Sequence, residues 1–278
     1  MHERWRPLQL PPTPATLWAE LRRRSPVLAF TGALHLMLLL ATMALLLLDS
    51  REVLGINVWI KPMKFMASLT IYLWTIAWLI GYIENARGSV LAISRGISTC
   101  MIIETACLLV QACRGVRSHF NHDTPFDSTV FGIMGVGIAI DTLLMIWMLA
   151  LFLRGESMIP RVYLWGIRLG IVVFLVGAVV GGMMSGNEGH TIGAVDGGPG
   201  LPFLNWRIDA GDLRVAHAFG LHGLQIMPFL GYILSRRARR TQGSSYSLAI
   251  LVSITVIYSL LILATLLQAL SGRPFAPL

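Results

Sequence analysis

Charged residues are scarce in this 278-residue chain, where they make up 13% of the sequence, about half of the roughly 25% typical of soluble domains. Hydrophobic residues make up 55%. A water-soluble fold with so little charge could not cover its own surface, and intrinsic disorder requires the opposite balance of residues. The composition therefore excludes both classes and predicts an integral membrane protein.

Lysine and cysteine are also rare. Lys61 and Lys64 are the two lysines among 22 basic residues, so arginine supplies most of the net charge of +8. The arginines stand mainly at the ends of apolar runs, which indicates a multispanning membrane protein with a lipid bilayer as its partner and not a nucleic-acid-binding protein. The three cysteines, Cys100, Cys107 and Cys113, lie within or beside one apolar run, so an extracellular disulfide framework is excluded.

Long apolar runs are what the chain has in abundance. A hydrocarbon core of about 30 Å needs about 20 apolar helical residues, and seven segments are long enough: 26–48, 62–83, 91–113, 129–153, 162–184, 213–234 and 248–270. We therefore predict an all-α, polytopic bundle of seven transmembrane helices that forms one domain over residues 26–271. Prolines and arginines in residues 1–25 predict an extended N-terminal tail.

The distribution of basic residues predicts the orientation of this bundle. With the N-terminus inside, 13 basic residues fall on the cytoplasmic side and 8 on the outer side, while Arg168 lies within the fifth span. The positive-inside rule therefore favours a cytoplasmic N-terminus and an outer C-terminus. In this orientation the long loop 185–212 and the short tail 272–278 are both outside.

Two carboxylates, Glu104 and Asp141, fall near the middle of the third and fourth predicted spans. An ionisable group at this depth costs about 2.5–3.5 kcal/mol, so both should face protein or water. Arg168 is the expected partner of Asp141. Either carboxylate could form structural hydrogen bonds between helices or carry a proton. Four polar or small residues of the third span share one helix face: Cys100, Glu104, Cys107 and Gln111.

Three polar stretches, residues 57–65, 114–127 and 185–225, are predicted to meet at the outer membrane surface. Their cations are candidate partners for an anionic small molecule or the acidic groups of a cofactor: Lys61, Lys64, Arg114, Arg117 and Arg214. Their candidate acid–base residues, with those of the spans, are Glu104, Asp141, Asp127 and Asp196.

Histidines are the candidate ligands of a haem or a metal ion. His35 lies in the first span, and His119 lies in the second outer stretch. His217 and His222 are five residues apart, about 140° around a helix, so they cannot both bind one metal ion from a regular helix. We expect His119, His217 and His222 as metal-ligand candidates and His35 with His222 as haem-ligand candidates.

Three motifs carry a resemblance to a known family. They are the WxKPxKF motif at 59–65, the RGxxSHFN motif at 114–121 and the DLRVAHxxGLH motif at 212–222. They resemble the signature stretches of a family of uncharacterised bacterial seven-helix integral membrane proteins. The resemblance covers most of the chain from the first to the sixth span. It implies a multi-pass protein of the bacterial inner membrane and implies no activity.

Three functional hypotheses fit these residues. The first is a redox protein that binds haem b or a transition metal through its histidines, with the outer cations holding the propionates. The second is a proton-coupled transporter or binding protein for an anionic solute or lipid. The third is an enzyme acting on a lipid or isoprenoid, in which His119, Asp127, Asp196 or His217 would carry out acid–base chemistry or hold a metal ion. We rank the first slightly above the other two.

Overall fold

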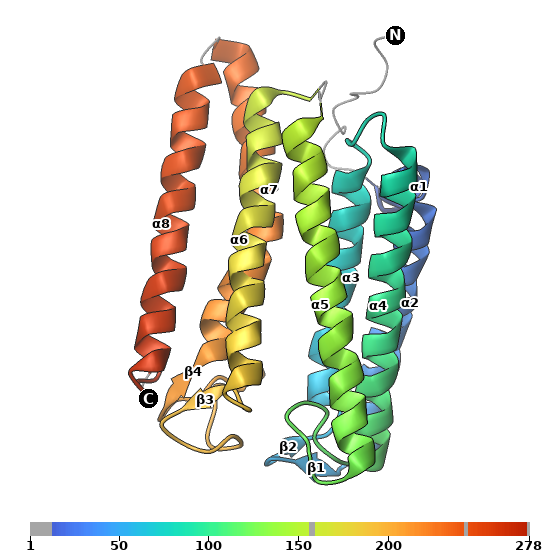
Figure 1. Cartoon of the computed structure of the whole chain (residues 1–278), viewed down its shortest axis with the longest axis vertical. Coiled ribbons are helices and arrows are strands. Elements are labelled where there is room, and N and C mark those ends of the chain that lie inside the picture. Colours follow the sequence, from blue (N-terminus) through green and yellow to red (C-terminus); the bar gives the residue numbers. More distant parts are fainter. Residues whose placement is uncertain (1–12, 156–158, 242–243, 277–278) are drawn as a thin grey trace.

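The computed structural model describes residues 13–155, 159–241 and 244–276 and consists almost entirely of helices (Figure 1). The helices of this part of the chain are α1 (Pro14–Arg24), α2 (Pro26–Leu48), α3 (Ile60–Ile80), α4 (Arg87–Arg114), α5 (Pro125–Arg154), α6 (Arg161–Gly186), α7 (Leu213–Thr241) and α8 (Ser244–Leu270). Two antiparallel pairs of two-residue strands complete it: β1 (Glu52–Val53) with β2 (Ile56–Asn57), and β3 (Thr191–Ile192) with β4 (Gly211–Asp212).

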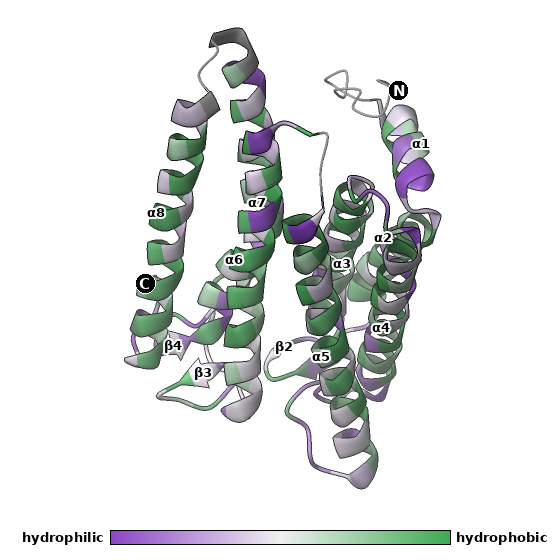
Figure 2. Cartoon of the chain, turned by 45° about the horizontal axis from the view of Figure 1, so that its top comes forward, coloured by the Kyte–Doolittle hydropathy of each residue, from purple (hydrophilic) through white to green (hydrophobic). Residues whose placement is uncertain are grey.

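Seven of these helices, α2 to α8, are long and apolar enough to cross a membrane. The predicted seven-helix membrane bundle is confirmed in this respect. Figure 2 shows hydrophobic residues along most of the helical surface and hydrophilic residues concentrated on α1 and near the ends of the bundle. Several helices begin before the predicted spans, because charged residues such as Arg87 and Asp127 occupy their first turns.

Both strand pairs lie at one end of the bundle, and α1 lies at the other (Figure 1). We call the first the strand end and the second the N-terminal end. The loop between α4 and α5 also lies at the strand end. The three polar stretches of the sequence therefore share one end of the molecule.

Residues 14–24 form a helix where we predicted an extended tail. Thr13 caps α1 by accepting a hydrogen bond from the backbone N–H of Thr16, and Pro14 suits the first turn. Arg24 ties α1 to the bundle, since its guanidinium donates to the Trp78 carbonyl at 2.6 Å and to the Tyr82 hydroxyl at 3.1 Å. The apolar face of the short helix and this buried arginine explain why the segment is helical and docked.

Arg24→Ala should therefore loosen α1 and destabilise the bundle by about 1.5–3 kcal/mol, because a hydrogen-bonded charged group is lost from a buried position. The measurement is the thermal unfolding temperature of detergent-purified protein. Arg23→Ala is the matched control, because Arg23 is exposed and pairs only with Glu20 on the same helix. Equal unfolding temperatures for the two variants would contradict the anchoring role of Arg24.

The helices divide into two contiguous groups, with α2 to α5 on one side and α6 to α8 on the other (Figure 1). The contact between α6 and α7 is unusually close because glycines face one another there. A Cβ atom placed on Gly220 would collide with the backbone of Gly177, and one on Gly166 would lie 2.7 Å from the Met227 carbonyl oxygen. Small residues are what allow two membrane helices to approach this closely.

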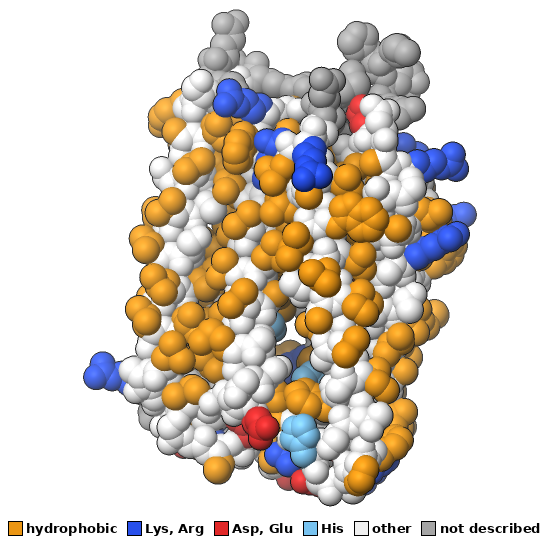
Figure 3. All heavy atoms as spheres, in the orientation of Figure 1, with side chains coloured by type: hydrophobic (Ala, Val, Ile, Leu, Met, Phe, Trp, Pro, Cys, Tyr) orange, Lys and Arg blue, Asp and Glu red, His pale blue; other side chains and the backbone are white. Residues whose placement is uncertain are grey.

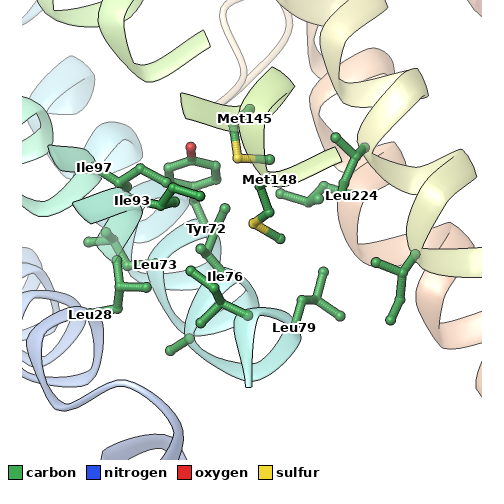
Figure 4. Close-up of a cluster of buried hydrophobic side chains, with 14 of the residues drawn as sticks. Leu28, Tyr72, Leu73, Ile76, Leu79, Ile93, Ile97, Met145, Met148 and Leu224 are labelled. Carbon is green, nitrogen blue, oxygen red and sulfur yellow. The ribbon is translucent and has the colours of Figure 1, made fainter. Parts of the chain in front are cut away.

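A large apolar cluster joins the two groups in the middle of the bundle and toward its N-terminal end. Figure 4 shows Tyr72 and Ile76 of α3 beside Met145 and Met148 of α5, with Leu224 of α7 facing them. All five side chains are buried. The interior is therefore sealed on the side of the N-terminal end.

Candidate functional site

The strand end brings together four side chains from all three polar stretches and from α4. Lys61 stands in the first turn of α3, Glu104 points from the interior of α4, His119 belongs to the loop after α4, and His217 lies in the second turn of α7. The His119 Nε2 atom lies 3.6 Å from the Glu104 Oε1 atom. We call these four residues the strand-end site.

Gly115 places His119 above Glu104. It ends α4 in the left-handed conformation, with φ at 71°, where a glycine has no steric penalty. The N–H of Gly115 donates to the Ala112 carbonyl and that of Val116 to the Gln111 carbonyl. The chain therefore turns back over the end of its own helix, and the imidazole reaches the carboxylate of α4.

Glu104 is a buried carboxylate with an unsatisfied oxygen atom. Its residue is 2% exposed, and its Oε2 atom has no hydrogen-bond partner among the described residues. Most buried polar groups are hydrogen-bonded, and an orphan such as this calls for a functional explanation. The nearest charges acting on Glu104 are those of Lys61, which attracts it, and Asp141, which repels it.

Lys61 is a half-buried cation that has no hydrogen-bond acceptor within the part of the chain that the structure describes. Its Nζ atom lies 5.9 Å from the centre of the Phe65 ring. It is attracted by Glu104 and Asp196 and repelled by Arg214 and Lys64. An ammonium group in this position lacks the partner that burial of a charge normally requires.

The imidazole of His119 is held neutral. Burial is the main cause of a pKa well below the usual histidine range, and repulsion from Lys61, and from His217 when that ring is protonated, lowers the pKa further. The ring packs against Phe65, with ring centres 5.6 Å apart, and its Nδ1 atom lies 3.1 Å from the Ser118 hydroxyl. His119 can therefore donate or accept a hydrogen bond at the site without carrying a charge.

One ring nitrogen of His217 forms a hydrogen bond within the protein, and the other has no hydrogen-bond partner among the described residues. Its Nδ1 atom donates to the Gly177 carbonyl at 2.8 Å. Because a carbonyl can only accept, the Nε2 atom of the neutral ring carries a lone pair. His217 therefore offers the site a hydrogen-bond acceptor whose orientation is fixed by α6.

Lys64 and Arg214, which we predicted as anion partners, hold the outer loop in place. Lys64 donates to the Leu204 carbonyl and to the Asn205 side chain, both at 3.1 Å. Arg214 donates to Asp212 and to the Asn205 carbonyl. These bonds fix residues 201–206 beside the strand-end site. The two cations are engaged by the protein itself.

Arg114 and Asp127 form a network that joins α4 to α5. Arg114 and Gln111 both donate to Asp127 Oδ1, and the Thr124 hydroxyl donates to its other oxygen. Both carboxylate oxygens of Asp127, a predicted acid–base candidate, thus accept hydrogen bonds at the start of α5. The last predicted cation, Arg117, makes only a long contact of 3.5 Å with Asp123 at the surface.

Asp141 lies deeper than the strand-end site and has a different partner from the predicted one. The Tyr72 hydroxyl lies 2.9 Å from both carboxylate oxygens. Arg168, the expected partner, instead donates to the Phe152 carbonyl at 3.0 and 2.7 Å. Asp141 therefore joins α5 to α3 and not to α6.

The arrangement does not support the haem and metal candidates. Both ring nitrogens of His35 are used, one by the Thr31 carbonyl at 2.7 Å and one by the Thr105 hydroxyl at 2.9 Å. His222 is exposed and contacts Gln225 at 3.4 Å. Within residues 13–155, 159–241 and 244–276, no three histidine, cysteine, aspartate or glutamate side chains are placed to hold a metal ion.

His190 was not singled out in the sequence, yet it lies next to the site. Its Nδ1 atom is 3.0 Å from Asp196 Oδ1, and Asp196 also accepts the backbone N–H groups of His190 and Thr191. Burial, and then the charge of Arg214, lower the pKa of His190 to about 4. In the sequence, the only indication of this contact is that His190 and Asp196 are six residues apart. That spacing brings the two side chains together only because the loop between them folds back.

The depressed pKa of His190 predicts a loss of stability in acid. The unfolded chain binds a proton below about pH 6.5, whereas the folded loop resists protonation until about pH 4, so stability present above pH 6.5 is lost as the pH falls through this range. The unfolding temperature of His190→Gln should fall less between pH 7.5 and 4.5 than that of the wild type. His122→Gln, at an exposed position, is the control, and identical slopes for wild type and His190→Gln would refute the effect.

Comparison with known proteins adds no relative from which a function could be taken. The chain matches no protein-family model, no curated protein and no solved structure at a significant level. The strand-end site combines two imidazoles with an ammonium group that meets no acceptor, and a carboxylate oxygen that meets no donor, in the part of the chain that the structure describes.

Proposed function

We propose that the protein binds a small anion at the strand-end site and exchanges a proton through Glu104, as a proton-coupled transporter or binding protein. The observation that carries this proposal is that Lys61 and Glu104 interact electrostatically, while the Lys61 ammonium group and the Glu104 Oε2 atom both lack a hydrogen-bond partner among the described residues. Of the three functional hypotheses, this one uses both groups.

An anion is the natural partner of Lys61. Burial of a charge is costly unless the charge is paired, and the surrounding arginine and lysine already have protein partners. An anion bound to Lys61 would lie in the field of Glu104. The negative charge of the anion and that of an ionised Glu104 would repel each other. Binding of the anion should therefore draw a proton onto Glu104, which couples the two events.

The site also specifies further features of the ligand. Glu104 Oε2 and His217 Nε2 are acceptors that meet no donor among the described residues, so a ligand that carries a hydroxyl or N–H group beside its anionic group would satisfy both. A small hydroxy acid and the headgroup of an anionic phospholipid share this chemistry. We therefore expect such compounds to bind more tightly than a simple halide.

The proposed location of the protein rests on its sequence. The arginine distribution supports a cytoplasmic α1 and a strand end on the outer side. The resemblance to bacterial seven-helix membrane proteins supports the inner membrane. The proposed site would then open toward the periplasm.

Isothermal titration of detergent-purified protein tests the binding step. Lactate, inorganic phosphate and phosphatidylglycerol in nanodiscs are the three probes, and at least one should bind saturably. Lys61→Met should weaken that binding at least tenfold, because the only unpaired ammonium group of the strand-end site is removed. The control, Arg273→Met, removes an equal charge from an exposed position at the same end. Absence of binding by all three probes, or equal binding by both variants, would refute the proposal.

A further inference from the structure

A row of polar side chains continues from the strand-end site along α3. Four polar residues, Lys61, Lys64, Ser68 and Thr75, share one helix face with the apolar Ile71, because the five are spaced three, four, three and four residues apart. All five are half-buried or exposed. At 1.5 Å per residue, Thr75 lies about 22 Å along the axis from the first residue of α3, which is at or beyond the middle of a 30 Å hydrocarbon core.

The facing residues on α7 are polar at the same depth. Gln225 donates from its Nε2 atom to the Thr75 hydroxyl at 3.3 Å, and its other side-chain atom contacts His222 Nδ1 at 3.4 Å. His222 and His217 also interact electrostatically. A chain of polar groups therefore leads from the strand-end site down to the contact between Thr75 and Gln225.

Some of these polar side chains are exposed. His222 and Ser68 are exposed although both lie within membrane-spanning helices. Polar side chains at this depth face protein or water, since contact with lipid tails is unfavourable. Figure 3 shows the face between the two helix groups hollowed toward the strand end, with histidine and basic side chains visible inside the hollow.

The row ends against an apolar barrier. Leu224 of α7 is fully buried next to Gln225, and it packs with Tyr72 and Ile76 of α3 in the central cluster (Figure 4). Phe174 of α6 stacks on Tyr72 with ring centres 5.5 Å apart. The polar row is therefore open toward the strand end and closed toward the N-terminal end.

We propose that the space between α3 and α7 is an aqueous crevice that extends from the strand-end site to Thr75 and Gln225, and that it accepts the ligand in its protonated, uncharged form. The second part rests on the proposed function. Ser68, Thr75 and Gln225 carry no charge, so these three groups can bond a carboxylic acid or hydroxyl group but cannot neutralise an anion. His222, which contacts Gln225, is the titratable side chain in this part of the row. Glu104, protonated when the anion binds, would give this proton to the ligand, which would then leave Lys61 for the crevice as a neutral acid while Glu104 becomes ionised again.

Cysteine accessibility tests the crevice without a ligand. In a background with Cys100, Cys107 and Cys113 replaced by alanine, Ser68→Cys and Thr75→Cys should react with a membrane-impermeant, positively charged methanethiosulfonate. Such reagents require a hydrated thiolate. The matched control is Ser259→Cys, at an exposed position within α8, and both crevice positions should react at least tenfold faster than this control.

Equal reaction rates at Thr75→Cys and Ser259→Cys would overturn the crevice, provided that all variants elute as the wild type does and label fully after denaturation in detergent. If Thr75→Cys fails the elution criterion, Ile71→Cys on the same face takes its place under the same expectation.

The ligand part of the proposal has a separate readout. Lactate at pH 5 should slow labelling of Thr75→Cys at least threefold, and the same concentration at pH 8 should not. If lactate protects Thr75→Cys at neither pH, the proposal that the crevice accepts the ligand is refuted, whereas the proposal of an aqueous crevice is unaffected. Failure of the proposed function would appear elsewhere, as binding that does not depend on Lys61.

Discussion

Glu104→Gln is expected to bind the anion about tenfold more tightly than the wild type at pH 8, and to bind it with the same affinity at pH 5. In the wild type, an ionised Glu104 opposes an anion held by Lys61, whereas a protonated Glu104 does not. Two unit charges within about 12 Å of each other interact by at least about 1.4 kcal/mol, or tenfold in affinity, at an effective dielectric constant near 20. Wild-type affinity should therefore increase as the pH falls, and the variant should lack this dependence.

Titration calorimetry at pH 5 and pH 8 measures both affinities, and repeating it in buffers of different ionisation enthalpy counts the protons taken up. The wild type should take up a proton on binding near neutral pH, and Glu104→Gln should take up none. Glu188→Gln, at an exposed position near the end of α6, should behave as the wild type. If Glu104→Gln keeps the wild-type proton uptake, Glu104 is not the coupling group.

Gly220→Ala is expected to destabilise the bundle by about 2–3 kcal/mol and to weaken anion binding as well. A Cβ atom at Gly220 would collide with the backbone of Gly177, and neither helix can move without disturbing the other glycine contacts. The displaced segment includes the Gly177 carbonyl that orients His217. One added methyl group should therefore affect both the fold and the site.

The unfolding temperature and the affinity for the best probe measure these two effects. Gly135→Ala is the matched control, because a Cβ atom there meets nothing within 4 Å and alanine is the better helix former by about 0.5–1 kcal/mol. The control should be as stable as the wild type or more stable. Equal stability of the two alanine variants would contradict the close contact of α6 and α7.

Sequence was informative about the spans because hydropathy reports directly on the membrane. It also indicated that the polar stretches share one surface. It was misleading for residues 14–24, where the prolines suggested an extended tail although Pro14 merely begins a helix. The length of the loop after α4 does not predict its path, so the sequence could not show that this loop turns back over Glu104. That turn depends on a single left-handed glycine, Gly115.

The partners of the polar residues could not be predicted either, because many of them are backbone carbonyls, which every sequence contains. Lys64, Arg168 and His217 each bond a carbonyl from a distant segment. The sequence shows that these side chains are polar or charged, but it does not show which acceptor atoms they hydrogen-bond. Lys61 is recognisable as different only after the other cations have been assigned their partners.

The division into two contiguous helix groups also has a consequence for synthesis of the protein. Helices α2 to α5 emerge from the ribosome before α6 to α8, so Glu104 enters the membrane before His217 exists. At that stage the imidazole of His217 on α7 is still missing from the site, and a neutral, protonated Glu104 is the cheaper form to insert into lipid. Docking of the last three helices would then be the step that completes the proposed binding site.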